Sequence, residues 1–365
     1  MTRIIDEHIH GTAGVSEAAH HRIHALRRGK VSGEYPDIHG MRRLDLLRKD
    51  LQAVHGARHQ HEVILLGSQL PGKLGAKAGA RARHKGRGLH TARLVASTEY
   101  REAMRVATWN VNSLRARVDR VVDWMVRADV DVLAMQEIKC TPEQLPAAPF
   151  IEAGYEIAAH GHNQWNGVAI ASRVGLEDIQ TEFPRQPSFG KGDTPAVVEA
   201  RALGATCGGV RVWSLYVPNG RALGDPHYAY KLEFLHTLKD AAAGWADKPT
   251  ALVGDFNVAP LATDIWDESD PEAATHVTAE ARAALASLAD AGFTELSRQF
   301  IPAERTYTFW DYKQLRFPRN EGMRIDFFWA SPPLVLAANA ARIEREERKG
   351  KGASDHVPVV VDFAL

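Results

Sequence analysis

The chain has 365 residues, and its 45 Lys and Arg balance its 45 Asp and Glu, so that it is formally neutral. Its two cysteines exclude a disulfide framework and favour a reducing compartment. No apolar run is long enough to cross a membrane, and the N-terminus lacks the apolar core of a secretory signal peptide. We therefore expect a cytoplasmic protein without a membrane partner.

The first part of the chain differs in composition from the rest. Residues 1–103 contain 18 Lys and Arg against 10 Asp and Glu, and they contain no Phe or Trp. A segment without these large aromatic side chains buries too little apolar surface to offset its chain entropy. We predict that 1–103 is a basic, largely disordered extension with a helix near 41–54, and that 104–365 is a single folded domain.

Short apolar runs rich in β-branched and aromatic residues predict the strands of this domain. The expected strands cover 105–111, 131–137, 155–160, 166–172, 196–203, 210–217, 250–256, 324–331 and 357–363. Apolar residues at steps of three and four predict helices over 115–126, 226–243 and 279–290. Asp225 and Thr278 are the expected N-caps of the last two helices.

This sequence of elements predicts an α/β fold that is rich in strands. The helices are too few to provide a crossover between every two successive strands, which excludes a doubly wound parallel sheet. Mixed or antiparallel sheets that pack on one another, with helices outside, fit better.

Polar side chains stand at the ends of several predicted strands. They are Asn110 and Asn112, Glu137, Asp255 and Asn257, Asp326, and Asp355 with His356. If these strand ends meet in space, carboxylate and amide oxygens form a pocket of hard ligands beside one histidine. Such a pocket is what a magnesium-dependent phosphodiesterase requires.

Each group suits one part of that chemistry. Asp255 can orient and deprotonate a water, and the neighbouring Asn257 can hold that water or a phosphoryl oxygen. Glu137 is suited to bind a hard metal ion. A protonated His356 beside the carboxylate of Asp326 supplies positive charge at a phosphate. Each motif alone also fits a simpler structure, namely an Asx-capped turn, an exposed strand end or a surface histidine.

Further aromatic and imidazole side chains have two interpretations each. Tyr216 ends a strand, where its hydroxyl donates to phosphate or its ring packs half-buried in the sheet. Segment 305–324 interleaves aromatic rings with basic side chains, which suits a nucleic-acid surface but also a core loop. The sequence offers no partners for His227 and His276, which are interpreted as surface or structural residues.

Taken together and in this order, the motifs resemble the exonuclease III family of DNA-repair nucleases, within the endonuclease/exonuclease/phosphatase superfamily. The matching stretches are Thr108 to Asn112, Gln136-Glu137, Asn166 to Ile170, Tyr216 to Gly220, Gly254 to Asn257, Arg324 to Asp326 and Ser354 to His356. The resemblance implies a four-layer α/β sandwich, in which two mixed β-sheets lie face to face with helices outside. It also implies Mg²⁺- or Mn²⁺-dependent cleavage of DNA at abasic sites, with 3′-to-5′ exonuclease activity and 3′-end cleaning.

The resemblance assigns roles to the matching positions. The implied catalytic residues are Tyr216, Asp255, Asn257, Asp326 and His356. The implied metal ligands are Asn112, Glu137, Asp255, Asn257, Asp355 and His356. The implied contacts to DNA are Asn110, Trp310 and Arg324, with Trp310 near the abasic sugar. The expected partner is double-stranded DNA with abasic sites or 3′ ends, and we expect a monomer.

Residues 1–103 have no counterpart in this family, whose members commonly begin directly with the first strand. Met104 is followed by a strand in the same way, so we expect translation to start there. The alternative is a basic arm that adds nonspecific affinity for DNA.

Two other functions remain as alternatives. The same pocket would serve a phosphoesterase of phosphoinositides or sphingomyelin, but segment 305–324 suits a nucleic acid better than a lipid. A non-catalytic DNA-binding protein is disfavoured, because every expected carboxylate and the histidine are present.

Overall fold

The structure, a computed structural model, describes residues 103–365 with the exception of 163, 191, 193 and 303. The disordered extension and the helix near 41–54 that the sequence predicts lie outside the described residues. None of the described helices is both long enough and apolar enough to cross a bilayer.

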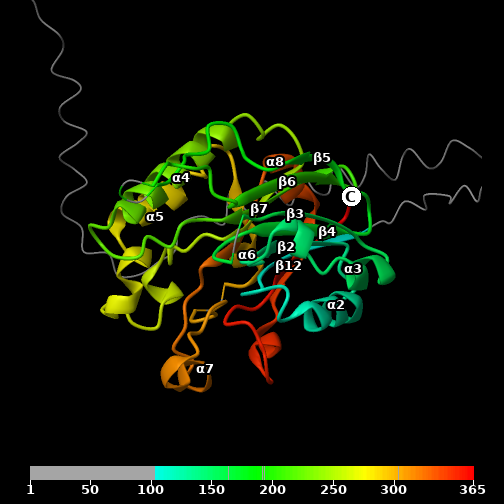
Figure 1. Ribbon diagram of the computed structural model, residues 1–365. Coiled ribbons are helices and arrows are strands. Elements are labelled where there is room, and N and C mark those ends of the chain that lie inside the picture. The colour runs from blue at the N-terminus through cyan, green and yellow to red at the C-terminus, as the bar shows by residue number, and fades with distance from the viewer. Residues whose placement is uncertain (1–102, 163, 191, 193, 303) are drawn as a thin grey trace, which may run out of the picture. The chain divides into compact units, whose positions relative to one another are not determined.

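The described strands form two six-stranded sheets (Figure 1). The first has the order β11-β12-β1-β2-β4-β3, with β1 Met104–Asn110, β2 Val132–Gln136, β3 Glu156–His160, β4 Val168–Ser172, β11 Ala338–Ile343 and β12 Val359–Phe363. The second has the order β5-β6-β7-β8-β10-β9, with β5 Glu177–Gln180, β6 Ala202–Cys207, β7 Val210–Tyr216, β8 Thr250–Asp255, β9 Thr294–Glu295 and β10 Asp326–Ala330. Both sheets are mixed, because β1 runs parallel to β2 and β7 parallel to β8 among antiparallel neighbours.

The two sheets pack face to face, because alternate side chains of their strands share one core. Val106, Val132 and Ile170 of the first sheet meet Val212 and Val253 of the second, and all five side chains are fully buried. Removing such apolar faces from water is the main favourable term in folding.

Helices cover the outer faces of both sheets (Figure 1). The helices are α2 Val118–Arg127, α3 Ala148–Glu152, α4 Pro226–Ala242, α5 Ala279–Ala286, α6 Leu296–Phe300, α7 Arg316–Arg319 and α8 Pro332–Ala337, and 3₁₀ turns cover Pro142–Gln144, Ala262–Asp264, Pro271–His276, Lys313–Leu315 and Arg345–Arg348. Trp124 of α2 and Phe150 of α3 pack on the first sheet, whereas Phe234 of α4 and Leu285 of α5 pack on the second. The predicted four-layer α/β sandwich is confirmed.

The individual elements agree with the prediction less uniformly. The predicted strand 196–203 is wrong in its first part, because β6 begins only at Ala202 and the chain before it is irregular. Strand β5 is missing from the prediction because all its residues are exposed and carry no apolar alternation. Asp225 and Thr278 are confirmed as N-caps, since their side-chain oxygens accept the backbone N–H of His227 and Ala281.

The directions of the strands bring their polar ends to one edge of the sandwich. Asn110 and Gln136 end the parallel strands β1 and β2 in register. Asp255 ends β8 opposite Asp326, which begins the antiparallel β10. His356 lies just before β12, which runs antiparallel to β1. An antiparallel strand begins where its partner ends, so these residues from distant parts of the sequence arrive at the same place.

Candidate active site

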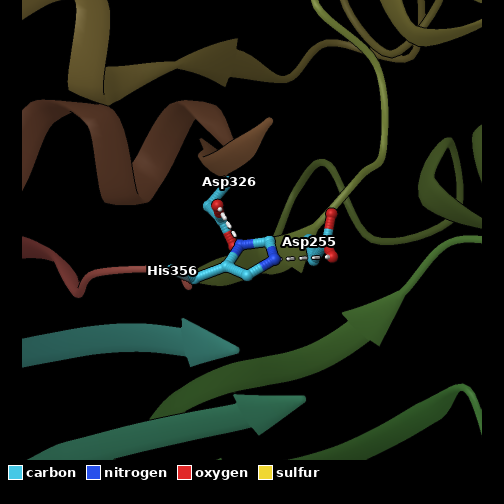
Figure 2. A group of neighbouring side chains, drawn as sticks. All are labelled: Asp255, Asp326 and His356. Carbon is cyan, nitrogen blue, oxygen red and sulfur yellow. Dashed lines mark hydrogen bonds and ion pairs between the residues drawn. The ribbon is translucent and has the colours of Figure 1, made fainter. Parts of the chain in front are cut away.

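A histidine and two aspartates form the centre of this edge (Figure 2). Nδ1 of His356 lies 2.9 Å from Oδ2 of Asp326, and Nε2 of His356 lies 3.8 Å from Oδ2 of Asp255. All three side chains are buried. The Thr308 hydroxyl donates a hydrogen bond of 2.6 Å to the same oxygen of Asp326. Asp326 therefore orients the imidazole so that its second nitrogen faces Asp255.

The charges of this cluster determine its protonation. Burial would lower the pKa of His356, but the negative charges of Asp326 and Asp255 outweigh it and raise that pKa to about 10. The imidazole is therefore a cation at neutral pH. Burial raises the pKa of Asp255 above its usual range, and the charges of Asp326 and Glu137 act in the same direction against that of His356. A carboxylate with a raised pKa is a better proton acceptor.

Glu137 is joined to this cluster through Asn110. The Asn110 amide nitrogen donates hydrogen bonds of 3.0 Å to Oε1 of Glu137 and of 3.0 Å to Oδ2 of Asp255. Tyr216 donates a bond of 2.8 Å to the same Oε1 of Glu137. Burial, together with the charge of Glu137, raises the pKa of Tyr216 well above its usual value, so the phenol remains a donor.

Lys139 places an ammonium group between two oxygen ligands. Its Nζ lies 2.8 Å from Oε2 of Glu137 and 2.6 Å from Oδ1 of Asn112. The Asn112 amide nitrogen donates in turn to Oδ1 of Asp355 over 3.0 Å. Burial would raise the pKa of Glu137, but the charge of Lys139 and the bond from Asn110 outweigh it and lower that pKa. Glu137 is therefore ionised at neutral pH.

The backbone turns sharply where these residues leave their strands. Asn112, Glu137 and Asn257 have φ of 43°, 51° and 52°, in the left-handed region that non-glycine residues rarely adopt. Gly254 precedes Asp255 with φ 147°, and a Cβ atom there would lie 1.9 Å from the carbonyl oxygen of Leu215. Local strain of this kind gathers at functional sites, where it aims side chains into a pocket.

Asn257 is held in one orientation by its neighbours. Its backbone N–H donates to Oδ1 of Asp255 over 2.9 Å, and its Nδ2 donates to the carbonyl of Val217 over 3.0 Å. Its Oδ1 lies 3.2 Å from Nε2 of His276, which donates when the proton is on that nitrogen. Burial, with the charge of Lys231, lowers the pKa of His276 to about 3, so that imidazole is neutral. His276 is therefore a buried residue that orients Asn257.

These groups line a cavity of about 210 Å³. Part of its wall is polar and includes Glu137, Asp255 and His356, and part is apolar and includes Phe309 and Met323. The ring centroids of Phe309 and His356 are 4.8 Å apart. A charged wall beside an apolar one suits a substrate in which a phosphodiester adjoins an uncharged group.

The oxygen donors around Lys139 fit a hard divalent cation. Glu137 and Asp355 offer carboxylate oxygens and Asn112 an amide oxygen, which are the ligand types that Mg²⁺ prefers. In this structure the Lys139 ammonium already brings a positive charge to two of these oxygens.

His356 is also a predicted metal ligand, and in this structure it is part of a charge-paired triad. Its Nδ1 donates to Asp326, and the charges of Asp326 and Asp255 raise its pKa, so the imidazole of the metal-free protein is a cation. Ligand atoms of Asp255, Asp326 and His356 lie within 4.8 Å of one another. The same three side chains therefore form a charge-paired triad and each offer one atom of a type that binds metal ions.

Two predicted DNA contacts, Arg324 and Trp310, are buried in this structure and do not line the cavity. The Arg324 side chain is fully buried and donates to Oγ of Ser297 over 2.6 Å. Trp310 is also fully buried and donates to Oδ1 of Asn320 over 3.3 Å. Its neighbour Phe309 lines the cavity instead. Successive side chains of an extended segment point to opposite sides, and the sequence does not reveal which side faces the pocket.

The other predicted residues do come together, and four further residues join them. Asn110, Asn112, Glu137, Tyr216, Asp255, Asn257, Asp326, Asp355 and His356 are linked by the contacts described above. The residues that sequence reasoning missed are Lys139, Trp266, Thr308 and Phe309. Lys139 stands two positions after Glu137, and this spacing could have indicated that it belongs to the site. Trp266 lies in a loop whose sequence carries no such indication.

Comparison with known proteins gives a consistent result. A family model described as the endonuclease/exonuclease/phosphatase family matches residues 107–356. The DNA repair nuclease APEX1 of Danio rerio is 30% identical over 271 residues, which are 72% of this chain and 83% of that protein. An AP endonuclease from Archaeoglobus fulgidus has a TM-score of 0.66 at 31% identity. The 3′ phosphatase NExo from Neisseria, bound to a product DNA hairpin, has a TM-score of 0.66 at 32% identity. Each structural match covers 72% of this chain and 100% of the other.

Proposed function

The chain belongs to the endonuclease/exonuclease/phosphatase family, and from this membership and the site geometry we propose that it is a metal-dependent phosphodiesterase of DNA repair. It cleaves double-stranded DNA at abasic sites and also acts as a 3′-to-5′ exonuclease that cleans 3′ ends. The AP endonuclease, the 3′ phosphatase and the DNA repair nuclease to which it is similar support this proposal.

The observation that carries the proposal is the convergence of four side chains from four parts of the fold. Glu137 and Asp255 accept bonds from one amide group, and His356 lies between Asp255 and Asp326. The cavity therefore has a metal-binding carboxylate in Glu137, a proton acceptor in Asp255 and a fixed cation in His356. In-line hydrolysis of a phosphodiester needs these three groups.

The roles of the chain's own groups follow from their contacts. Asp255 orients a water molecule and accepts its proton as the water oxygen bonds to phosphorus, while Asn257 holds that water in line. Protonated His356 donates a hydrogen bond to a phosphoryl oxygen and offsets the charge that develops there. The bond from phosphorus to the 3′-oxygen breaks, and that oxygen takes a proton from solvent. Tyr216 keeps its proton and donates to the phosphate or to Glu137.

We propose Mg²⁺, or Mn²⁺ in its place, as the cofactor. Glu137, Asp355 and Asn112 would hold it, with Asp255 and Asn257 at its edge. When bound, such a cation polarises the phosphoryl oxygen and stabilises the leaving oxygen. It carries more charge than the Lys139 ammonium that contacts the same oxygens here.

The apolar wall of the cavity supports an abasic nucleotide as substrate. Phe309 and Met323 line the cavity beside His356 and offer contact to a sugar that carries no base. We further propose that the protein acts as a monomer in the cytoplasm. Its two free and buried cysteines agree with a reducing compartment.

The test is incision of a duplex with a single abasic site by the full chain in Mg²⁺. We expect cleavage at that site, loss of activity in EDTA and recovery with added Mg²⁺. Asp255→Asn should lower turnover by about 10²- to 10⁴-fold, while Asp247→Asn, which changes an exposed aspartate, should not. Duplexes with a nick or a blunt end measure the exonuclease activity. No cleavage of any DNA, together with hydrolysis of a phosphoinositide or sphingomyelin, would contradict the proposal.

A further inference from the structure

Lys231 is a fully buried lysine that the proposed mechanism does not use. It lies on α4, and its Nζ donates to the carbonyl oxygens of Asn257 and Thr275 over 2.6 Å each. A third carbonyl, that of Asn219, lies 3.4 Å away. An ammonium group has three donors and no acceptor. The three donors of Lys231 are therefore matched by three main-chain carbonyls.

The three carbonyls belong to three separate loops around the cavity. Asn219 follows β7, Asn257 follows β8, and Thr275 lies in the 3₁₀ turn before α5. Each loop contributes to the cavity wall, through Asn219, Asn257 and His276 among others. Lys231 thus contacts the loops through their backbones and does not itself line the cavity.

Other bonds also link the same loops. The Thr275 hydroxyl donates to the carbonyl of Asn219 over 2.9 Å. The Ala259 N–H donates to the carbonyl of His276 over 2.8 Å. His276 likewise reaches both of the other loops, because its Nε2 lies 3.2 Å from Oδ1 of Asn257 and 3.5 Å from Nδ2 of Asn219. Lys231 differs in that it joins all three loops through their backbone carbonyls.

A lysine at this position carries an energetic cost, although its donors also satisfy buried carbonyls. Burial lowers the pKa of Lys231 to about 7, against the raising effect of the charge of Asp255. Keeping a cation here costs solvation energy that an apolar side chain of similar shape, such as methionine, would not cost. What methionine lacks is the ability to hold three carbonyls in fixed relative positions.

We infer that Lys231 is a positioning residue of the active site, whose ammonium group joins three loops and thereby fixes Asn219, Asn257 and His276 relative to one another. The prediction of an effect on turnover rests on the proposed function, whereas the prediction of an effect on loop order does not. Displacing a group by about 1 Å from its productive position can cost about 10²-fold in rate.

The first experiment is hydrogen–deuterium exchange of the full chain without substrate. Lys231→Met should exchange at least about tenfold faster than wild type in peptides covering 217–225, 256–261 and 271–277, with little change in β1 and β2. Lys239→Met is the matched control, because Lys239 lies on the same helix with its side chain 36% exposed. Unchanged exchange in the three loops, or an equal increase over the whole domain, would overturn the inference.

The second experiment separates kcat from KM on an abasic duplex. Lys231→Met should lower kcat by about 10²-fold with KM within about threefold of wild type. Lys231→Gln retains two donors, so its kcat should lie between those of wild type and Lys231→Met, and this variant also decides the matter if the methionine protein does not fold. A wild-type kcat in the glutamine and methionine variants, or a loss confined to KM, would contradict positioning. If wild type itself cleaves no DNA, the proposed function fails, and the exchange experiment alone still decides the role of Lys231.

Discussion

Nδ1 of His356 and Oδ2 of Asp326 are 2.9 Å apart, although the two residues belong to different sheets. His356 precedes β12 in the first sheet, and Asp326 begins β10 in the second. The pair therefore forms only when the two sheets are packed in their final register. Its existence links the charge of the imidazole to the fold of the whole domain.

Replacing Asp326 with Asn should lower the pKa of His356. The asparagine oxygen can still accept the bond from Nδ1, but the carboxylate charge that favours the imidazolium is lost. In NMR titration of the metal-free protein, the midpoint of His356 should fall by about one pH unit or more from its raised position near 10. The control is Asp362→Asn. Asp362 lies on β12 and pairs with Arg105, so its replacement should leave the pKa of His356 unchanged. An unaltered midpoint in Asp326→Asn would contradict this account.

The same pair makes the stability of the fold depend on pH in a defined direction. The pKa of His356 is raised in the folded state, so folding favours the protonated form. Its contribution is fully present below about pH 6.5, where unfolded histidine is protonated, and is lost as pH rises toward about 10. The difference in free energy of unfolding between wild type and Asp326→Asn, measured in urea, should shrink over that range. A constant or growing difference would show that another titrating group dominates the pH dependence of stability.

Glu137→Gln should weaken Mg²⁺ binding by at least about tenfold, because the site loses one of its few carboxylate charges. Calorimetric titration of the metal-free protein measures this directly. Added Mg²⁺ should also raise the melting temperature of wild type more than that of the variant. The exposed Glu143, replaced in the same way, is the control and should bind Mg²⁺ like wild type. Equal affinity in wild type and Glu137→Gln would remove Glu137 from the metal site.

Much of the fold and of the site follows from local sequence patterns. Strands such as β7 and β8 are apolar runs of ordinary length, and their polar ends carry Tyr216 and Asp255 in readable positions. The sequence of strand β11 does not indicate a strand, because its alanines and Asn339 give no apolar alternation and Ile343 is its single β-branched residue. It pairs with β12 only through tertiary context.

What the sequence did not reveal is the direction of side chains in irregular segments. The segment around Phe309 has no helical or strand period long enough to assign its faces. Lys139 stands close to Glu137 in the sequence, but its contact with Asn112, like that of His276 with Asn257, depends on oxygens that the fold brings to it. Residues of this kind become visible only when distant loops are placed together.

Arg324→Met should affect stability rather than DNA binding. The Arg324 side chain is fully buried and bonded to Ser297, with Glu295 3.8 Å away. Removing these contacts should lower the free energy of unfolding by about 1–3 kcal/mol, as measured in urea. KM for an abasic duplex should remain within about twofold of wild type. A raised KM at unchanged stability would restore Arg324 as a DNA contact.

The adjacent aromatic residues Phe309 and Trp310 should behave in opposite ways. Trp310 is fully buried, and its replacement by Ala should lower the free energy of unfolding by about 3–5 kcal/mol. Phe309 is only partly buried, and it lines the cavity with its ring beside His356, so Phe309→Ala should cost less stability but raise KM for an abasic duplex. Phe309→Leu, which keeps an apolar wall, should recover most of that loss. Urea unfolding and steady-state kinetics on the same preparations separate the two effects. A larger rise in KM for the Trp310 variant than for the Phe309 variant would return the sugar contact to Trp310.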